Sequence, residues 1–192
     1  MAECDGTIGE TEARKTLLLN VDGGSRGNPG PAGIGVVIRE PSGRVVQEIS
    51  ESIGRTTNNV AEYRAMIRGL ETCRALNAQR VLVCSDSELL VRQMVGTYRV
   101  KAQHLQPLHE QATRLARSFS QVAFRQIPRE QNAHADRLAS EAIEGRAAAS
   151  GDTSGEFELV EGDPAIWIQR GSEPGESPPA AGPATDVGRG AS

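Results

Sequence analysis

The chain has 192 residues, of which 38% are hydrophobic and 24% charged, and its formal net charge is −4. This length is sufficient for one well-filled core. The three cysteines form neither a C-x-x-C pair nor an even-numbered framework, which excludes a disulfide scaffold and fits a reduced, cytoplasmic setting. No segment is apolar for long enough to predict a membrane span, and no signal peptide is recognisable.

Charge is distributed unevenly along the chain. Residues 1–15 carry four acids and two bases, and residues 147–192 carry eight acids and two bases, which leaves 17 bases against 13 acids in residues 16–146. This central region is the predicted folded domain. Its basic balance suits a polyanionic partner, although an arginine-rich surface that behaves as neutral would have the same composition.

The first predicted strand, residues 17–21, runs into the glycine-rich stretch of residues 22–30, which begins with Asp22. A carboxylate beside uncovered backbone is typical of a ligand site, and it is also typical of an ordinary turn. The stretch has neither a Gly-Lys-Ser/Thr ending nor a G-x-G-x-x-G motif, so it does not predict a phosphate-binding loop. Residues 33–38 and 46–51 continue as strands, and together the segments predict a three-stranded meander.

From Asn58 the periodicity changes to that of a helix, which Asn58 or Asn59 can cap. Glu62 is expected in its first turn, either as favourable charge at the helix N-terminus or turned toward the core. Residues 81–85 then form a continuous apolar strand that ends in Asp86. Asp86 is expected at a strand-to-helix corner before residues 87–95, either as a cap or as a ligand.

Three more elements follow. A helix is predicted around residues 105–119, a strand at residues 122–127 and a loop at residues 128–132. The last helix places Asp136 in its first turn, at the margin of the buried stripe. Four acids therefore occur at strand ends or helix starts.

In an α/β sheet, the carboxyl ends of adjacent strands and the nearby helix starts converge on one crevice. If the strands that end in Asp22 and Asp86 are neighbours, their carboxylates lie close together and repel unless protons or cations neutralise them. Ligands that offer only oxygen favour Mg²⁺ or Mn²⁺ over Zn²⁺. The pattern therefore predicts a divalent metal site.

Four blocks of the sequence resemble the signatures of type 1 ribonuclease H, and they occur in the same order. The blocks are residues 22–33, 57–62, 85–89 and 129–139. The resemblance spans residues 16–146, and the predicted order β-β-β-α-β-α-α-β-α matches that family. It implies an α/β, ribonuclease H-like fold with a five-stranded mixed sheet, three antiparallel then two parallel strands, and helices on both faces.

The resemblance also implies an activity, which is metal-dependent hydrolysis of the RNA strand of RNA/DNA hybrids. Asp22, Glu62, Asp86 and Asp136 match the catalytic, metal-binding acids. Two Mg²⁺ ions, or Mn²⁺ in their place, would activate a water and stabilise the leaving oxygen, giving 5′-phosphate and 3′-hydroxyl ends. Substrate contacts are expected from one set of polar residues, with the paired asparagines near RNA 2′-hydroxyls: Asn28, Asn58, Asn59, Ser25, Ser87 and Glu88.

The sequence departs from that family in two places. Many members have a histidine-bearing loop before the last aspartate, whereas here residues 128–132 form only a short link; Arg129 is a candidate replacement and His134 is expected to be a solvated helix residue. The helical basic protrusion of many members is also missing between residues 96 and 103. A short single-domain form with a weaker grip on substrate is therefore expected.

The two ends of the chain are predicted to be disordered, at residues 1–15 and in the acidic Gly-, Pro-, Ser- and Ala-rich tail of residues 147–192. Apolar islands at residues 157–160 and 166–168 interrupt the tail; sequence drift is favoured over a docking motif for another protein or a strip that packs back on the domain. A monomer is expected. The alternative function is a hybrid- or RNA-binding module of the same fold with weak or no catalysis.

Overall fold

The computed structural model describes residues 15–145 and 166–169, and residues 157–160 and most of both ends lie outside the described residues. Its sheet has the strand order β3-β2-β1-β4-β5-β6. Three strands form an antiparallel meander: β1 (Thr16–Ser25), β2 (Gly30–Arg39) and β3 (Val45–Thr56). Next to β1 lies β4 (Arg80–Ser85), which is parallel to β1 and to β5 (Gln121–Gln126). The predicted five-stranded mixed sheet is confirmed.

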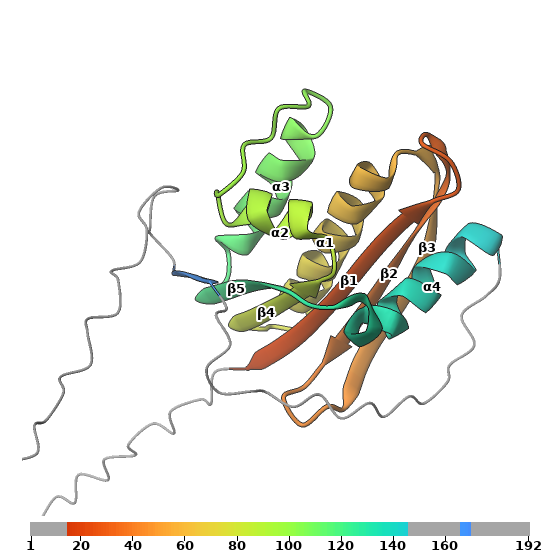
Figure 1. Ribbon diagram of the computed structural model, residues 1–192. Helices are drawn as coiled ribbons and strands as arrows, with labels where there is room; N and C mark the ends of the chain where they lie inside the picture. Colours follow the sequence, from red (N-terminus) through yellow and green to blue (C-terminus); the bar gives the residue numbers. More distant parts are fainter. Residues whose placement is uncertain (1–14, 146–165, 170–192) are drawn as a thin grey trace, which may run out of the picture.

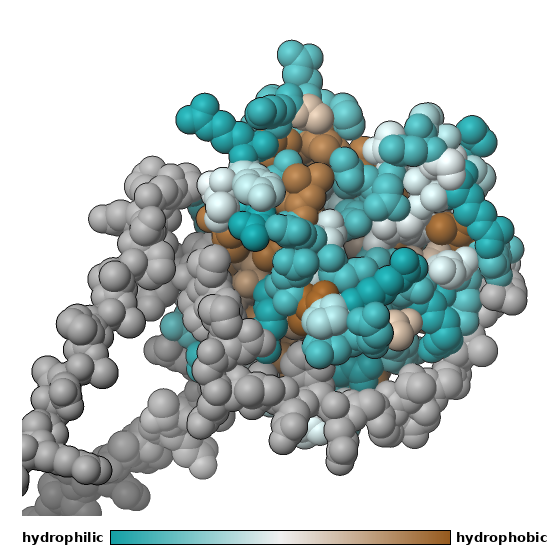
Figure 2. Space-filling view, viewed as in Figure 1, coloured by the Kyte–Doolittle hydropathy of each residue, from teal (hydrophilic) through white to brown (hydrophobic). Residues whose placement is uncertain are grey.

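Helices cover both faces of this sheet, as expected (Figure 1). One face carries α1 (Asn58–Ala75), α2 (Glu88–Met94) and α3 (Gln106–Ala116). A short 3₁₀ turn, η1 (Arg129–Asn132), leads from β5 into α4 (Ala133–Glu144), which packs on β1, β2 and β3 from the opposite side. Figure 2 shows that the outward face of α4 is hydrophilic, so its apolar face is turned to the sheet.

The main core lies between the sheet and α1. Leu17, Leu19 and Val21 point to this core because alternate residues of a strand face opposite sides. They are fully buried. Leu18, between them, lies on the α4 side with Leu82, where a second, smaller cluster forms. The alternation fixes which face each residue of β1 occupies, Asp22 included.

The sheet has a sixth strand that the sequence did not predict. Four tail residues form β6 (Ile166–Gln169), which pairs antiparallel with β5 and continues the sheet beyond the predicted edge. Disorder was therefore the wrong prediction for residues 166–169. The physical reason is that β5 is an edge strand with free backbone donors and acceptors, and a short apolar segment satisfies them through its main chain.

The beginning of the described chain is also attached to the domain, one residue before β1. The backbone carbonyl of Lys15 accepts hydrogen bonds from the backbone N–H groups of Gln79 and Arg80, and its Nζ donates to the carbonyl of Leu76 at 2.9 Å. Lys15 is thus held in place, contrary to the expectation for residues 1–15. Among the described residues, no helix is both long and apolar enough to cross a membrane.

Candidate active site

Asp22 lies inside β1 and not at its end. The strand continues to Ser25, and Asp22 pairs with Gly35 of β2. The expectation of a strand that stops at Asp22 was wrong because Gly23 and Gly24 keep an extended backbone and pair with Ile34 and Gly33. The carboxylate therefore projects from the middle of a hydrogen-bonded strand, which holds its backbone rigidly.

The glycine after Asp22 serves helix packing. A Cβ added to Gly23 would lie 2.2 Å from the carbonyl carbon of Ala61 in α1, so only glycine allows this approach of helix to strand. Gly33 and Gly35 accommodate the backbone of α4 in the same way. The backbone at these glycines is therefore covered by helices, whereas the sequence had suggested uncovered backbone beside Asp22.

Glu62 projects from α1 toward Asp22, and it lies beyond the first turn of the helix. Thr57, not an asparagine, caps α1, and its hydroxyl accepts from the N–H of Val60 at 3.4 Å. Asn58 is thereby free to donate from Nδ2 to Glu62 Oε1 at 3.1 Å. The Ser87 side chain also hydrogen-bonds Glu62, so residues of two helices orient this carboxylate.

Asp86 follows β4 directly, as predicted, but it does not cap α2; Ser87 does, through its hydroxyl and the N–H of Leu90. Asp86 Oδ1 instead accepts from Asn132 Nδ2 at 2.8 Å. The same amide group donates to the carbonyl of Val21 at 2.9 Å, and Asn132 Oδ1 accepts from Asn20 at 3.3 Å. Asn132 thus connects Asp86 to β1.

Asp136 lies in the first turn of α4, as predicted. Its Oδ1 accepts from the Arg129 guanidinium at 2.6 Å. The Arg129 side chain is 73% exposed. The charges of Asp136, Asp86 and Asp22 all raise the pKa of Arg129, so this arginine faces the whole group of acids from the solvent side.

The four acids act on one another electrostatically. Burial, and then the charges of Asp86 and Asp136, raise the pKa of Asp22 to about 7, although Arg129 opposes the shift. Burial also raises the pKa of Glu62 to about 7; the Ser87 hydrogen bond opposes this, while Asp22 and Asp86 add to it. The site therefore carries more negative charge than its surroundings neutralise.

Residues 15–145 and 166–169 contain no three His, Cys, Asp or Glu side chains that are gathered tightly enough to hold a metal ion as they stand. Glu62, Asp86 and Asp136 each accept a hydrogen bond from a different neighbour, respectively Asn58, Asn132 and Arg129. The donor set nevertheless fits a hard divalent cation, because it offers only carboxylate oxygens, and burial together with the neighbouring acids raises the pKa of Asp22 and Glu62, an environment that a bound cation would relieve.

The expected substrate-contact residues fall into two groups. Asn28 and Asn58 lie together at the edge of the site, where Asn28 Oδ1 accepts from the backbone N–H of Asn58 at 3.3 Å. Asn59 is exposed beside them. The others are more peripheral: Ser25 ends β1, Ser87 caps α2, and Glu88 forms an exposed ion pair with Arg92 at 2.6 Å.

His134 is not solvated, contrary to expectation, and its side chain is only 11% exposed. Its Nδ1 lies 2.8 Å from Arg39 Nη2, and its Nε2 lies 2.7 Å from Glu48 Oε1. Burial, together with Arg39 and Arg137, lowers the pKa of His134 although Glu48 opposes this. The ring packs between α4 and the β2–β3 hairpin, so it does not replace the missing histidine loop.

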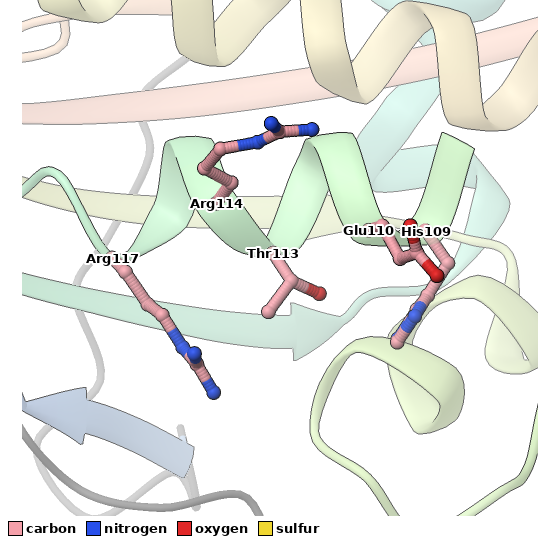
Figure 3. Close-up of a pocket in the computed structure, with 5 residues that line it drawn as sticks. All are labelled: His109, Glu110, Thr113, Arg114 and Arg117. Atoms are coloured by element: carbon pink, nitrogen blue, oxygen red, sulfur yellow. The ribbon is translucent and has the colours of Figure 1, made fainter. Parts of the chain in front are cut away.

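A hollow of about 270 Å³ on α3 is separate from the acids; its lining residues are His109, Glu110, Thr113, Arg114 and Arg117. Figure 3 shows that Arg114 points to the opposite side of α3 from Thr113 and Arg117. The two arginines do not converge on a common point. We assign no function to this hollow.

The most important residue that sequence reasoning missed is Asn132. It was placed in a loop without a role, yet it is 1% exposed and contacts two other parts of the site. A signal was present, since Asn132 lies one helical turn before Asp136. Its partners are 46 and 111 residues away, however, and only the folded chain brings them together.

The fold is an α/β fold with a mixed sheet, and comparisons with known proteins identify its family. The family model described as "Reverse transcriptase-like" matches residues 20–142. The bifunctional protein Rv2228c of Mycobacterium tuberculosis is 44% identical over 135 residues, which are 70% of this chain and 37% of that protein. The chain thus spans little more than a third of the length of that relative.

Solved structures agree. RNase H1 of Halobacterium salinarum matches with a TM-score of 0.66 and 35% identity, over 68% of this chain and 98% of that one. LC11-RNase H1, solved in complex with an RNA/DNA hybrid, matches with a TM-score of 0.64 and 45% identity, over 67% of this chain and 97% of that one. The chain belongs to the ribonuclease H family.

Proposed function

We propose that this chain hydrolyses the RNA strand of RNA/DNA hybrids in a reaction that requires divalent metal ions. The observation that carries the proposal is the convergence of four acids from β1, α1, α4 and the end of β4 on one electrostatically coupled site. The hybrid bound to LC11-RNase H1, which is 45% identical, supports the substrate class.

The carboxylates of Asp22, Glu62, Asp86 and Asp136 would hold the cations, two Mg²⁺ ions or Mn²⁺ in their place. When bound, these ions activate the attacking water and neutralise the charge that develops on the phosphate and the leaving oxygen. The expected products have 5′-phosphate and 3′-hydroxyl ends. All four acids are present, which favours an enzyme over a module that only binds.

The remaining residues would position the hybrid. Asn28, Asn58 and Asn59 lie at one edge of the acids, where amide donors and acceptors can read the 2′-hydroxyl that distinguishes RNA from DNA. Arg129, exposed on the solvent side, can pair with a phosphate once a cation takes over Asp136. Its guanidinium would thereby exchange the Asp136 carboxylate for a substrate phosphate.

The test uses the full chain and a hybrid labelled on its RNA strand. Cleavage in Mg²⁺ or Mn²⁺, its loss in EDTA, and its loss in Asp86→Asn are expected. Glu40→Gln, a carboxylate change in the exposed β2–β3 turn, is the control and should cleave normally. Calorimetric titration with Mg²⁺ should show weakened binding in Asp86→Asn. Cleavage that persists in Asp86→Asn would overturn the assignment.

A further inference from the structure

The α4 side of the sheet is covered unevenly. Helix α4 packs on β1, β2 and β3. Beyond it, a compact apolar patch spans β1, β4 and β5 and ends just past β5; its members are Leu18, Leu82, Cys84, Ala123 and Ile127. In the described part of the chain, no helix packs over the β4 and β5 portion of this face. All five residues are nevertheless buried, with exposures of 4% or less.

The chemistry around this patch indicates what can cover it. Arg80 and Arg125 lie on the same face, because each is two residues from a patch member on its strand. The centre of the surface is therefore apolar and its margin is basic. An extended segment that turns apolar residues and an acid to the same side would match both features.

The tail contains such a segment. Residues 156–161 read Glu-Phe-Glu-Leu-Val-Glu, so in an extended conformation Phe157, Leu159 and Glu161 would point to one side. They lie outside the described residues, but β6 fixes where the chain must go next, at the outer edge of β5. Helix α4 ends at Glu144 over β1 to β3, so residues 145–165 connect two sides of the patch.

The distances allow this path. Residues 161–165 separate Val160 from β6, and six Cα-to-Cα steps span at most about 20 Å. Adjacent strands lie roughly 4.8 Å apart, so β4 is about 10 Å from β6 and β1 about 15 Å. Phe157 and Leu159 therefore have enough chain to reach the patch from the anchored strand.

We propose that the β4 and β5 portion of this sheet face is an intramolecular docking surface whose occupant is the tail segment of residues 157–160, anchored by β6. The tail is then part of the domain. The proposal is independent of the catalytic function, since it rests on the sheet and not on the four acids.

Cysteine labelling tests the proposal, because Cys73 and Cys84 are both buried and lie on opposite sides of the sheet. Cys84 belongs to the patch, whereas Cys73 packs in the main core under α1 and is the internal control. The full chain in a Cys4→Ser background is treated with a thiol-alkylating reagent, and labelling of each cysteine is followed by mass spectrometry.

In the parent chain, slow labelling of both cysteines is expected. In Phe157→Ser/Leu159→Ser, labelling of Cys84 should rise roughly tenfold or more while that of Cys73 stays slow, because only the local cover is lost. Val187→Ser, another apolar-to-polar change in the tail, should leave both rates unchanged. Trp167, the single tryptophan, reports by its fluorescence whether the strand that carries it has been disturbed.

Two results would overturn the proposal. Rapid labelling of Cys84 in the parent chain would show that nothing covers the patch in solution. Unchanged protection of Cys84 in the double variant would show that another segment is the occupant. If Cys73 also becomes reactive, the variant has unfolded globally, and the single changes Phe157→Ser and Leu159→Ser then replace it; protection of Cys84 in both would count against the proposal.

Discussion

The four acids form two pairs whose surroundings differ. Asp86 and Asp136 each accept a hydrogen bond from a side-chain nitrogen, of Asn132 and Arg129 respectively. Asp22 and Glu62 are half-buried as well, and for these two desolvation raises the pKa to about 7, in Glu62 despite hydrogen bonds from Ser87 and Asn58. Ionisation of the second pair is opposed by desolvation and by the neighbouring acids, so equivalent changes in the two pairs should differ in their effect on stability.

The largest effect should be on catalysis, where the two pairs must behave alike. Asp22→Asn and Asp86→Ala should each lower the rate of hybrid cleavage roughly a thousandfold or more, because each removes charge that the cations require. Single-turnover cleavage of labelled RNA measures the loss. A variant that keeps a tenth of the activity would show that its acid lies outside the reacting centre.

Substitutions in the two pairs should have opposite effects on the free energy of unfolding. At pH 8 in EDTA, Asp22→Asn should raise the free energy of unfolding by on the order of 1 to 3 kcal/mol, because it removes a buried carboxylate that is ionised without a cation. Asp86→Ala should lower it by about 1 to 3 kcal/mol, because it removes the acceptor of one of the two hydrogen bonds that the buried Asn132 Nδ2 donates. Urea unfolding measures both, and destabilisation by Asp22→Asn would contradict the comparison.

The raised pKa of Asp22 should also make the free energy of unfolding of the wild-type chain depend on pH. The pKa of Asp22 rises from the ordinary aspartate value of 3.8, which applies to the unfolded chain, to about 7 in the folded chain, so between these values the folded state binds more protons than the unfolded state. In EDTA, the contribution of Asp22 should therefore weaken folding as pH rises from about 4 to 7. The unfolding curves of wild type and Asp22→Asn should converge near pH 4; parallel curves would refute the raised pKa.

Asn132→Ala probes the link from Asp86 to β1. Cleavage should fall about tenfold to a hundredfold, and calorimetric Mg²⁺ affinity should fall with it, because Asp86 loses the donor that orients it. Asn132→Asp provides a comparison of equal size that places a like charge beside Asp86, and it should bind Mg²⁺ differently from Asn132→Ala. Normal Mg²⁺ affinity in both variants would reduce Asn132 to a packing role.

The smallest effect should come from Arg129→Ala. Its ion pair with Asp136 is largely exposed, so the free energy of unfolding should change by less than about 1 kcal/mol. Cleavage should fall about twofold to tenfold if the guanidinium contacts a substrate phosphate. Arg129→Lys should recover only part of that loss because lysine lacks the planar fork. Full activity in Arg129→Ala would exclude a substrate role.

Much of this architecture could be predicted from local sequence. The helical period from Tyr63 to Cys73 and the alternation around Leu18 are properties of neighbouring residues, so the core faces of α1 and β1 could be assigned. The positions of Asp86 after β4 and Asp136 in α4 followed from the same local signals. The elements that position the four acids were thus predictable from the sequence.

What could not be predicted depends on contacts between distant residues or on the main chain alone. The contact of Asn132 with Val21 joins residues 111 positions apart. The sequence next to His134 is typical of a solvated helix position. Its low exposure results from the approach of Arg39 and Glu48 in the folded chain. Strand β6 is joined to β5 through backbone pairing. So short a segment has no side-chain periodicity from which a strand could be predicted.

The close approach at Gly23 has a consequence for how this site responds to change elsewhere. Because α1 meets β1 main chain to main chain at Ala61, a backbone contact sets the separation of the two backbones that carry Asp22 and Glu62. That contact holds the two backbones at a fixed separation. Cation affinity should therefore report on how closely α1 packs against β1. Any loosening of α1 would change the separation of Asp22 and Glu62 before the domain unfolds.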